Sequence, residues 1–312
     1  MNIIWPALVA MRGSRVKAIM AGLKILVWVG LLLAVGLSSV SAESLKVFVS
    51  ILPQAYFAER IGGELVEVEV LVGPGQSPAT YEPSARQLMA LAEADVFFRI
   101  GVPFEGHLLK KIEAIMPDFH VVDTRQGIEL RRIKGLSDSG GEAVSKEHGH
   151  GGDDPHIWLD PSLAIKISGN ICQEMIRLDS NHADYYSRNL AALVRDLNEI
   201  DRRMAEILAP YKGRAFYVYH PAFGYFGDRY GLSQVAIEIE GKEPGARQLA
   251  EIIDRARREN VRVLFVQAQF ARKSARAVAS AIDGAVIAID PLAYNYLENM
   301  EELAEKLAGA LE

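Results

Sequence analysis

The sequence predicts an α/β protein of two lobes, each a mainly parallel sheet flanked by helices, joined by one long backbone helix. Short apolar runs alternate with helix-period segments between residues 44 and 178, and the same alternation returns after Gly213. This alternation is typical of parallel sheets covered by helices. Between the two regions runs an unbroken helical pattern of about 27 residues, about 40 Å long at about 1.5 Å per residue.

Residues 1–42 have the pattern of a secretory signal peptide. Four basic residues precede the apolar run ILVWVGLLLAVGL, and small residues follow it up to Ala42. A run of about 13 residues is shorter than the roughly 20 that span a bilayer, so we expect cleavage near Ala42. The only cysteine is Cys172, so no cysteine is available for acylation at the cleavage site. We therefore expect a free periplasmic protein.

Residues 43–180 form the predicted N-terminal lobe. Its expected strands are residues 45–51, 66–73, 95–101 and 120–124. Its expected helices are residues 53–63, 84–94, 105–117 and 161–178. Residues 135–154 are polar, rich in glycine and without periodicity, which predicts a mobile loop within this lobe.

Residues 181–211 form the predicted linking helix. Its apolar residues recur at three- and four-residue spacing: Tyr186, Leu190, Leu193, Leu197, Ile200, Met204 and Ile207.

Residues 212–312 form the predicted C-terminal lobe. The expected strands are residues 215–220, 234–240, 261–267 and 285–290. The expected helices are residues 221–231, 246–260, 273–282 and 299–312.

The charge balance excludes one class of partner. The chain has 34 basic and 40 acidic residues, and four of the basic residues lie in residues 1–42, which hold no acidic residue. Residues 43–312 therefore carry a formal charge of −10. Nucleic-acid binding requires a basic face, so no nucleic-acid partner is expected. The lone Cys172 sits on an apolar helical stripe and is expected to be a buried structural thiol.

Three segments bring together imidazole and carboxylate side chains: DDPHIWLDP with His156, YVYHPAFGYFGDRYG with His220, and VIAIDPLA with Asp290. His220 and Asp290 directly follow predicted strands, and ligands of open α/β sheets bind beyond the carboxyl ends of strands. His156 lies in a loop before a helix whose N-cap and first residue are predicted to be Asp160 and Pro161. We expect the three side chains to meet in one cleft.

Four segments resemble, in order and spacing, the zinc- and manganese-type solute-binding proteins of bacterial ABC transporters. They are TYEPSARQLMALAEADVFF, DPHIWLDPSLA, HPAFGYFGDRYGL and VQAQFARKSARAVASAIDGAVIAIDPLA. The resemblance covers essentially the whole chain after the signal peptide. It implies two lobes bridged by a rigid helix, one metal ion in the cleft, and delivery of that metal to an ABC permease in the inner membrane.

The resemblance also implies metal ligands at the positions of His156, His220 and Asp290. Manganese-type members have Glu where this chain has His220, which favours Zn²⁺ over Mn²⁺ as the cargo. Imidazole nitrogen and carboxylate oxygen are ordinary zinc ligands, usually four in number. We expect the protein to act as a monomer.

One expected ligand is missing, because members of the resembled family read PHTYEP or PHTFEP where this chain reads PATYEP. Ala79 stands at the position of the histidine. Water could complete a three-ligand site, a nearby side chain could replace the histidine, or metal binding could be lost. The candidate replacements are Glu82, Gln76 and Glu105 near the substitution and His148 and His150 in the predicted loop.

Glu82 has a second interpretation. Ser84 and Gln87 form an S-x-x-Q capping box, so Glu82 could simply lead the chain into the helix that follows.

The sequence favours a binding protein over an enzyme. A zinc hydrolase would need a general base beside the open position, and the chain holds neither HExxH nor another compact catalytic motif. Two further hypotheses keep the scaffold. In one, the protein binds a different metal, a metal chelate or an organic solute, with Ala79 making room; in the other, it has a structural or adhesive role after loss of the site.

Overall fold

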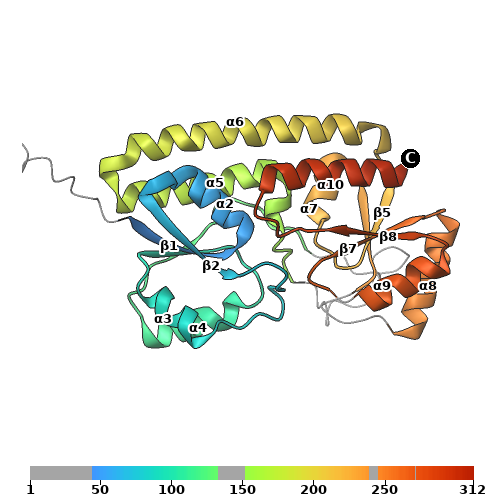
Figure 1. The fold of residues 1–312 in the computed structure, drawn as a ribbon, viewed down its shortest axis with the longest axis horizontal. Coiled ribbons are helices and arrows are strands. Elements are labelled where there is room, and N and C mark those ends of the chain that lie inside the picture. Colours follow the sequence, from blue (N-terminus) through green and yellow to red (C-terminus); the bar gives the residue numbers. More distant parts are fainter. Residues whose placement is uncertain (1–43, 133–151, 239–244, 271) are drawn as a thin grey trace, which may run out of the picture. The chain divides into compact units, whose positions relative to one another are not determined.

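The computed structural model describes residues 44–132, 152–238, 245–270 and 272–312 (Figure 1). The predicted signal peptide, residues 1–42, lies outside these ranges, as do His148 and His150 of the predicted loop. Within the described ranges, no helix combines the length and apolar character needed to cross a membrane.

The N-terminal sheet has four parallel strands in the order β2-β1-β3-β4. The strands are β1 (Leu45–Ile51), β2 (Val66–Val72), β3 (Val96–Arg99) and β4 (Val121–Asp123). The central strand β1 is buried from Val47 to its end, whereas the edge strand β2 alternates half-buried valines with exposed glutamates. The edge strand β2 is therefore covered less completely than the central strand.

Four helices flank this sheet: α2 (Leu52–Gly62), α3 (Ala85–Ala92), α4 (Glu105–Ile115) and α5 (Pro161–Leu178). Figure 1 shows α2 and α5 on one side of the sheet and α3 and α4 on the other. The capping box predicted for α3 is present, because the Ser84 hydroxyl accepts from Gln87 N and Ser84 N donates to Gln87 Oε1. Helix α5 begins at Pro161 behind its N-cap Asp160, also as predicted.

The C-terminal sheet repeats the same order, β6-β5-β7-β8, again with parallel pairs. Its strands are β5 (Ala215–Val218), β6 (Ser233–Ala236), β7 (Val263–Gln267) and β8 (Ala285–Ile289). Its helices are α7 (Gly224–Tyr230), α8 (Ala246–Arg258), α9 (Arg272–Ala281) and α10 (Tyr296–Leu311). The helix predicted from residue 221 thus begins later, at Gly224. It ends where Gly231 takes a left-handed conformation with φ 71°.

The predicted linking helix is α6 (Ala183–Leu208), a helix of 26 residues. It packs on α2 and α5 of the first lobe and on α10 of the second (Figure 1). The residues of its buried face are Tyr186, Leu193, Leu197, Ile200, Met204 and Leu208. One apolar stripe therefore contacts both lobes, and the predicted fold class is confirmed.

Ion pairs add specific contacts between α6 and its neighbours. Arg60 of α2 lies 2.6 Å from Asp196, and Glu301 of α10 lies 2.6 Å from Arg203. The contacts between residues group Ser44–Glu312 into one compact unit. The domain boundaries at residues 180 and 211 therefore remain a prediction.

Trp158 joins the two lobes from a short 3₁₀ turn, Ile157–Leu159. Its indole Nε1 donates to the Pro291 carbonyl at 2.7 Å, and the Tyr296 hydroxyl donates to the Trp158 carbonyl at 2.6 Å. Both aromatic side chains are buried. Because a buried polar group without a partner is costly, this pair of bonds fixes how the loop before α5 meets the loop after β8.

Tyr296→Phe should lower the free energy of unfolding by about 1–3 kcal/mol, because it removes the buried donor to the Trp158 carbonyl. Tyr294→Phe is the matched control: Tyr294 is 41% exposed and donates its hydroxyl to Glu59 at the surface, so its loss should stay within about 0.5 kcal/mol. Urea denaturation of the three proteins measures both values. Equal losses of unfolding free energy in the two variants would show that the hydrogen bond from Tyr296 to Trp158 contributes no more than an exposed one.

Candidate metal centre

His156 is placed by a tightly held turn. The three residues after it form the buried 3₁₀ turn, and the Asp160 side chain then accepts from Ser162 N at 2.8 Å to start α5. The His156 side chain itself keeps 12% of its surface exposed. The loop can therefore present an imidazole from a backbone that has little freedom.

A buried carboxylate sets the orientation of the His156 ring. Asp154 Oδ1 lies 2.7 Å from His156 Nδ1 and also accepts from the His156 backbone N–H at 3.1 Å. A carboxylate can only accept, so this contact makes Nδ1 the protonated nitrogen. The lone pair of the neutral ring is then on Nε2, where a metal can bind it.

Asp154 is in turn held by both lobes. Its backbone N–H donates to the Arg131 carbonyl at 2.8 Å, and its carbonyl accepts from the Tyr225 hydroxyl of α7 at 3.1 Å. The same hydroxyl accepts from Arg131 N at 2.9 Å. The packing is close at the start of α7, because a Cβ on Gly224 would lie 1.6 Å from Arg131 Nη1 and 2.8 Å from Asp154 Oδ2, so a larger residue would displace these side chains.

His220 shows the same arrangement in the second lobe. It follows β5, and its Nδ1 lies 3.1 Å from Oε2 of the buried Glu238. Burial lowers the pKa of His220 below its ordinary value of 6.5, although the Glu238 contact acts in the opposite direction. The imidazole therefore stays neutral to lower pH than a free histidine, which is the form that binds a metal.

The structure brings the two predicted histidines together. The ring centroids of His156 and His220 are 5.3 Å apart, with the rings at 74° to each other. Each ring has a carboxylate on Nδ1, so both Nε2 atoms remain for a shared ligand.

Asp290 is not brought into a cluster with them. Its Oδ1 accepts from Gln269 Nε2 at 2.8 Å and from Leu292 N at 3.0 Å. Among the residues that the structure describes, no three His, Cys, Asp or Glu side chains are close enough to hold a metal ion. Asp290 is connected to His156 through Trp158, because the carbonyl of the neighbouring Pro291 accepts from the Trp158 indole, whose ring centroid lies 5.3 Å from that of His156.

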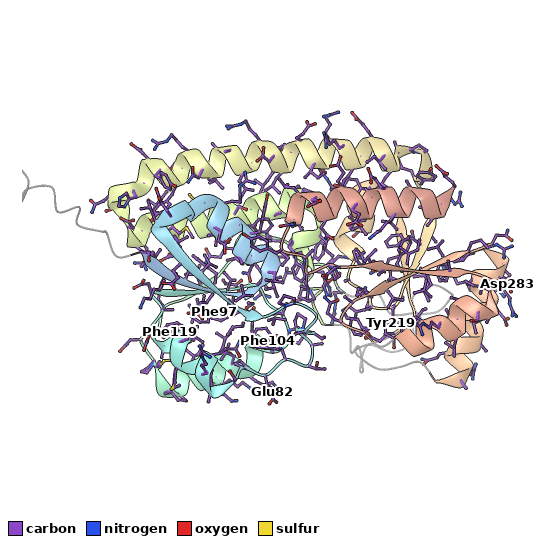
Figure 2. The ribbon with its side chains drawn as sticks, in the orientation of Figure 1. Glu82, Phe97, Phe104, Phe119, Tyr219 and Asp283 are labelled. Carbon is purple, nitrogen blue, oxygen red and sulfur yellow. The ribbon has the colours of Figure 1, made fainter. Side chains whose placement is uncertain are left out.

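Ala79 and Glu82 lie at a separate hollow of about 390 Å³ on the α3 and α4 side of the first lobe. Both residues are exposed, and His107 and Lys111 of α4 also line this hollow. Figure 2 shows Glu82 near Phe104, another lining residue. Glu82 therefore faces this hollow beside the start of α3.

The remaining candidate replacements are engaged or lie outside the described residues. Gln76 accepts from Gly73 N at 2.8 Å. Glu105 accepts from the Ser50 hydroxyl and from the backbone N–H groups that follow β3. Burial raises the pKa of Glu105 despite these donors. His148 and His150 lie outside the described ranges.

Sequence reasoning missed the two carboxylates that orient the histidines. Asp154 stands two positions before His156, but the predicted mobile loop 135–154 includes it; that prediction is wrong for Asp154, which the structure buries and bonds to Arg131 and Tyr225. Glu238 stands just beyond β6, the strand beside β5, so the rule that ligands gather at the carboxyl ends of strands could have identified it.

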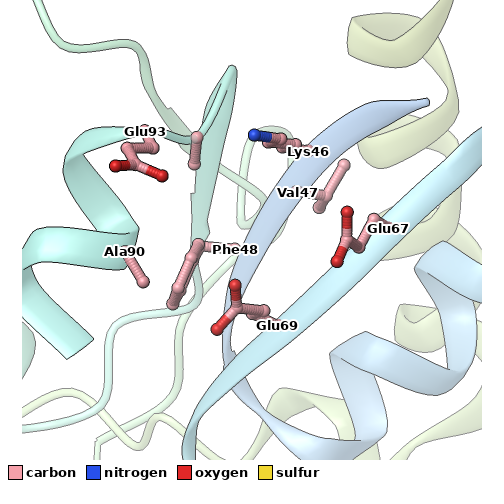
Figure 3. Close-up of a pocket in the computed structure, with 8 residues that line it drawn as sticks. Lys46, Val47, Phe48, Glu67, Glu69, Ala90 and Glu93 are labelled. Carbon is pink, nitrogen blue, oxygen red and sulfur yellow. The ribbon is translucent and has the colours of Figure 1, made fainter. Parts of the chain in front are cut away.

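A second hollow, of about 200 Å³, lies toward the amino-terminal ends of strands β1 and β2 in the first sheet. Figure 3 shows Glu67 and Glu69 on β2 and Glu93 facing them across it, with Lys46 at its edge. These residues belong to the amino-terminal ends of β1 and β2 and the end of α3, away from the edge that carries ligands in such sheets. No histidine lines this hollow.

Known proteins resemble this chain in sequence and in fold. The zinc-binding lipoprotein AdcA of Streptococcus pneumoniae (strain ATCC BAA-255 / R6) is 32% identical over 241 residues, 72% of this chain. The chain spans only 45% of the length of that relative. The manganese-binding lipoprotein MntA of Bacillus subtilis (strain 168) is 28% identical over 225 residues, covering 71% of this chain and 70% of MntA.

A solved structure described as the crystal structure of ZnuA has a TM-score of 0.78 and 38% identity. The match covers 86% of this chain and all of that one. Residues 47–310 match the family described as "ZnuA: Zinc-uptake complex component A periplasmic". The chain therefore belongs to the family of zinc-uptake complex component A.

Proposed function

We propose that this protein captures one divalent metal ion, Zn²⁺ in preference to Mn²⁺, between its two lobes and delivers it to an ABC permease in the inner membrane. The observation that carries the proposal is the pairing of His156 with His220. One imidazole comes from each lobe, and each has its Nδ1 occupied by a buried carboxylate. Two nitrogen ligands in this state favour zinc over cations that prefer oxygen ligands alone.

Asp290 is the proposed third ligand. Its support is its place directly after β8 and the bond from Trp158 to the neighbouring Pro291. The donors Gln269 and Leu292 both bond to Oδ1 of Asp290. We therefore propose that Asp290 binds the metal through Oδ2 and keeps both hydrogen bonds on Oδ1. This requires the carboxylate to move toward the two histidines.

Water is the proposed fourth ligand, because Ala79 offers no donor atom. Three protein ligands with an open position are a stable zinc arrangement. Glu82 remains a second candidate, but it would have to leave the hollow that it now lines. His148 and His150 remain candidates as well.

An open zinc position can also support hydrolysis, but that reaction needs a general base next to the metal-bound water. The two buried carboxylates nearest the histidines, Asp154 and Glu238, already accept from ring nitrogens. Capture and release fit these residues better than catalysis.

The signal-peptide pattern of residues 1–42 and the family description, which includes the word periplasmic, support the proposed location. We propose a free periplasmic monomer after cleavage near Ala42. Relatives such as AdcA and MntA are described as lipoproteins. This chain carries its only cysteine at position 172.

Zinc titrated into chelator-stripped residues 43–312 should bind one ion per chain by calorimetry, and manganese should bind more weakly. His156→Ala and His220→Ala should each abolish tight binding, because each removes a nitrogen ligand. His182→Ala is the matched control, since His182 also pairs with a carboxylate, Asp179, but at the start of α6. Absence of zinc binding in the unsubstituted protein would overturn the proposed function.

Ala79→His should tighten zinc binding by about tenfold or more, about 1.4 kcal/mol, if water holds the fourth position. The new imidazole would replace a weakly held water, which requires the loop of Ala79 to turn from the hollow that it lines toward the two histidines. Ala79→Asn, a polar side chain without an imidazole, should leave the affinity close to that of the unsubstituted protein. Competition with a zinc chelator measures the three affinities, and an unchanged value for Ala79→His would place the fourth ligand elsewhere.

Zinc affinity should be nearly constant above about pH 7 and should fall at lower pH, because the metal competes with protons for each imidazole. Burial lowers the pKa of His220, so its share of the loss should appear below pH 6.5. The fall should approach about tenfold per pH unit for each imidazole that must lose a proton. Chelator competition between about pH 5 and 8 tests this, and an affinity already falling between about pH 8 and 7 would contradict it.

A further inference from the structure

Neighbouring residues contact both the backbone and the ring of His220, and Gln267 contacts the backbone. The Gln267 side chain donates from Nε2 to the His220 carbonyl at 2.7 Å and accepts from His220 N at 3.1 Å. Gln267 is fully buried and is the last residue of β7, the strand next to β5. Its amide therefore continues the pairing of β5 and β7 past the end of β5.

The strand on the other side of β5 supplies Glu238. Ile237 N donates to the Val218 carbonyl at 3.0 Å and Glu238 N to the Tyr219 carbonyl at 2.9 Å, so the pairing with β6 also continues beyond its last residue. This backbone path brings the Glu238 carboxylate, 2% exposed, to His220 Nδ1.

The ring face of His220 is covered as well. Phe270 stacks on it with the ring centroids 4.8 Å apart and the planes at 23°. His156 meets the ring nearly edge-on from the other lobe. Rotation of the His220 ring would disturb the Phe270 stack and the Glu238 bond together.

We propose that Glu238 is a positioning residue for metal capture: it holds His220 as the Nδ1–H form with Nε2 directed to the metal. This inference rests on the proposed function. A carboxylate that accepts from a ligating imidazole also makes the ring a better donor, and loss of such a partner typically weakens metal binding by about 10–100-fold.

The test compares Glu238→Gln with the unsubstituted protein by two measurements. The first is nitrogen NMR of the imidazole rings in the metal-free protein, with His220 assigned by His220→Ala. The second is zinc affinity by chelator competition. Glu259→Gln is the matched control, because Glu259 accepts from the Tyr217 hydroxyl at 2.8 Å in the same lobe, at the end of α8.

We expect His220 of the unsubstituted protein to carry its proton on Nδ1. Glu238→Gln should reduce that form and weaken zinc binding by about 10–100-fold, whereas Glu259→Gln should change neither. A His220 protonated mainly on Nε2 in the unsubstituted protein would overturn the proposal, whether or not any variant folds. So would unchanged affinity in Glu238→Gln, or an equal loss in Glu259→Gln.

Failure of zinc capture and failure of the proposed role of Glu238 would give different results. If the unsubstituted protein binds no zinc, the proposed function fails, and metal positioning fails with it. If zinc binds tightly but the NMR shows no dependence of His220 on Glu238, only the role of Glu238 is overturned.

Discussion

The apolar stripe of α6 is the constraint on which the rest of the structure depends. The same buried face, from Tyr186 to Leu208, packs on α2 and α5 at one end and on α10 at the other. Because burial is favourable in proportion to apolar area, neither lobe can slide along the helix without exposing part of that stripe. Asp201 adds a directed contact, since it accepts from Arg229 and from the Tyr230 hydroxyl at the end of α7. The loops that carry His156 and His220 meet because this shared helix holds both lobes.

The two sheets share one strand order but use their carboxyl ends differently. In the second lobe, the ends of β5, β6, β7 and β8 lead to His220, Glu238, Gln267 and Asp290 in turn. At the corresponding edge of the first lobe, Glu105 accepts from the Ser50 hydroxyl and from the N–H groups after β3. The contribution of the first lobe comes instead from the loop before α5. Most of the groups around the candidate metal centre therefore come from the second sheet.

Periodicity and capping signals predicted the strands, the long helix and the start of α5, because these depend on local pattern. The same signals placed His156 and His220 beside sheet edges, and their two rings lie together in the structure. The direction of the Asp290 carboxylate could not be predicted, because it depends on which donors compete for its oxygens. Asp290 illustrates this, since Gln269 and Leu292 occupy its Oδ1. Glu238 was missed because its partner lies 18 residues away and is reached only through strand pairing.

The position of Trp158 has an optical consequence. The other two tryptophans, Trp5 and Trp28, lie within the predicted signal peptide, so residues 43–312 contain a single indole. That indole is buried, its N–H is bonded across the lobes to Pro291, and its ring lies 5.3 Å from His156. Its fluorescence therefore comes from one environment next to a candidate ligand. A change in the charge or orientation of that imidazole should alter the emission, which would give the protein an intrinsic reporter that needs no attached dye.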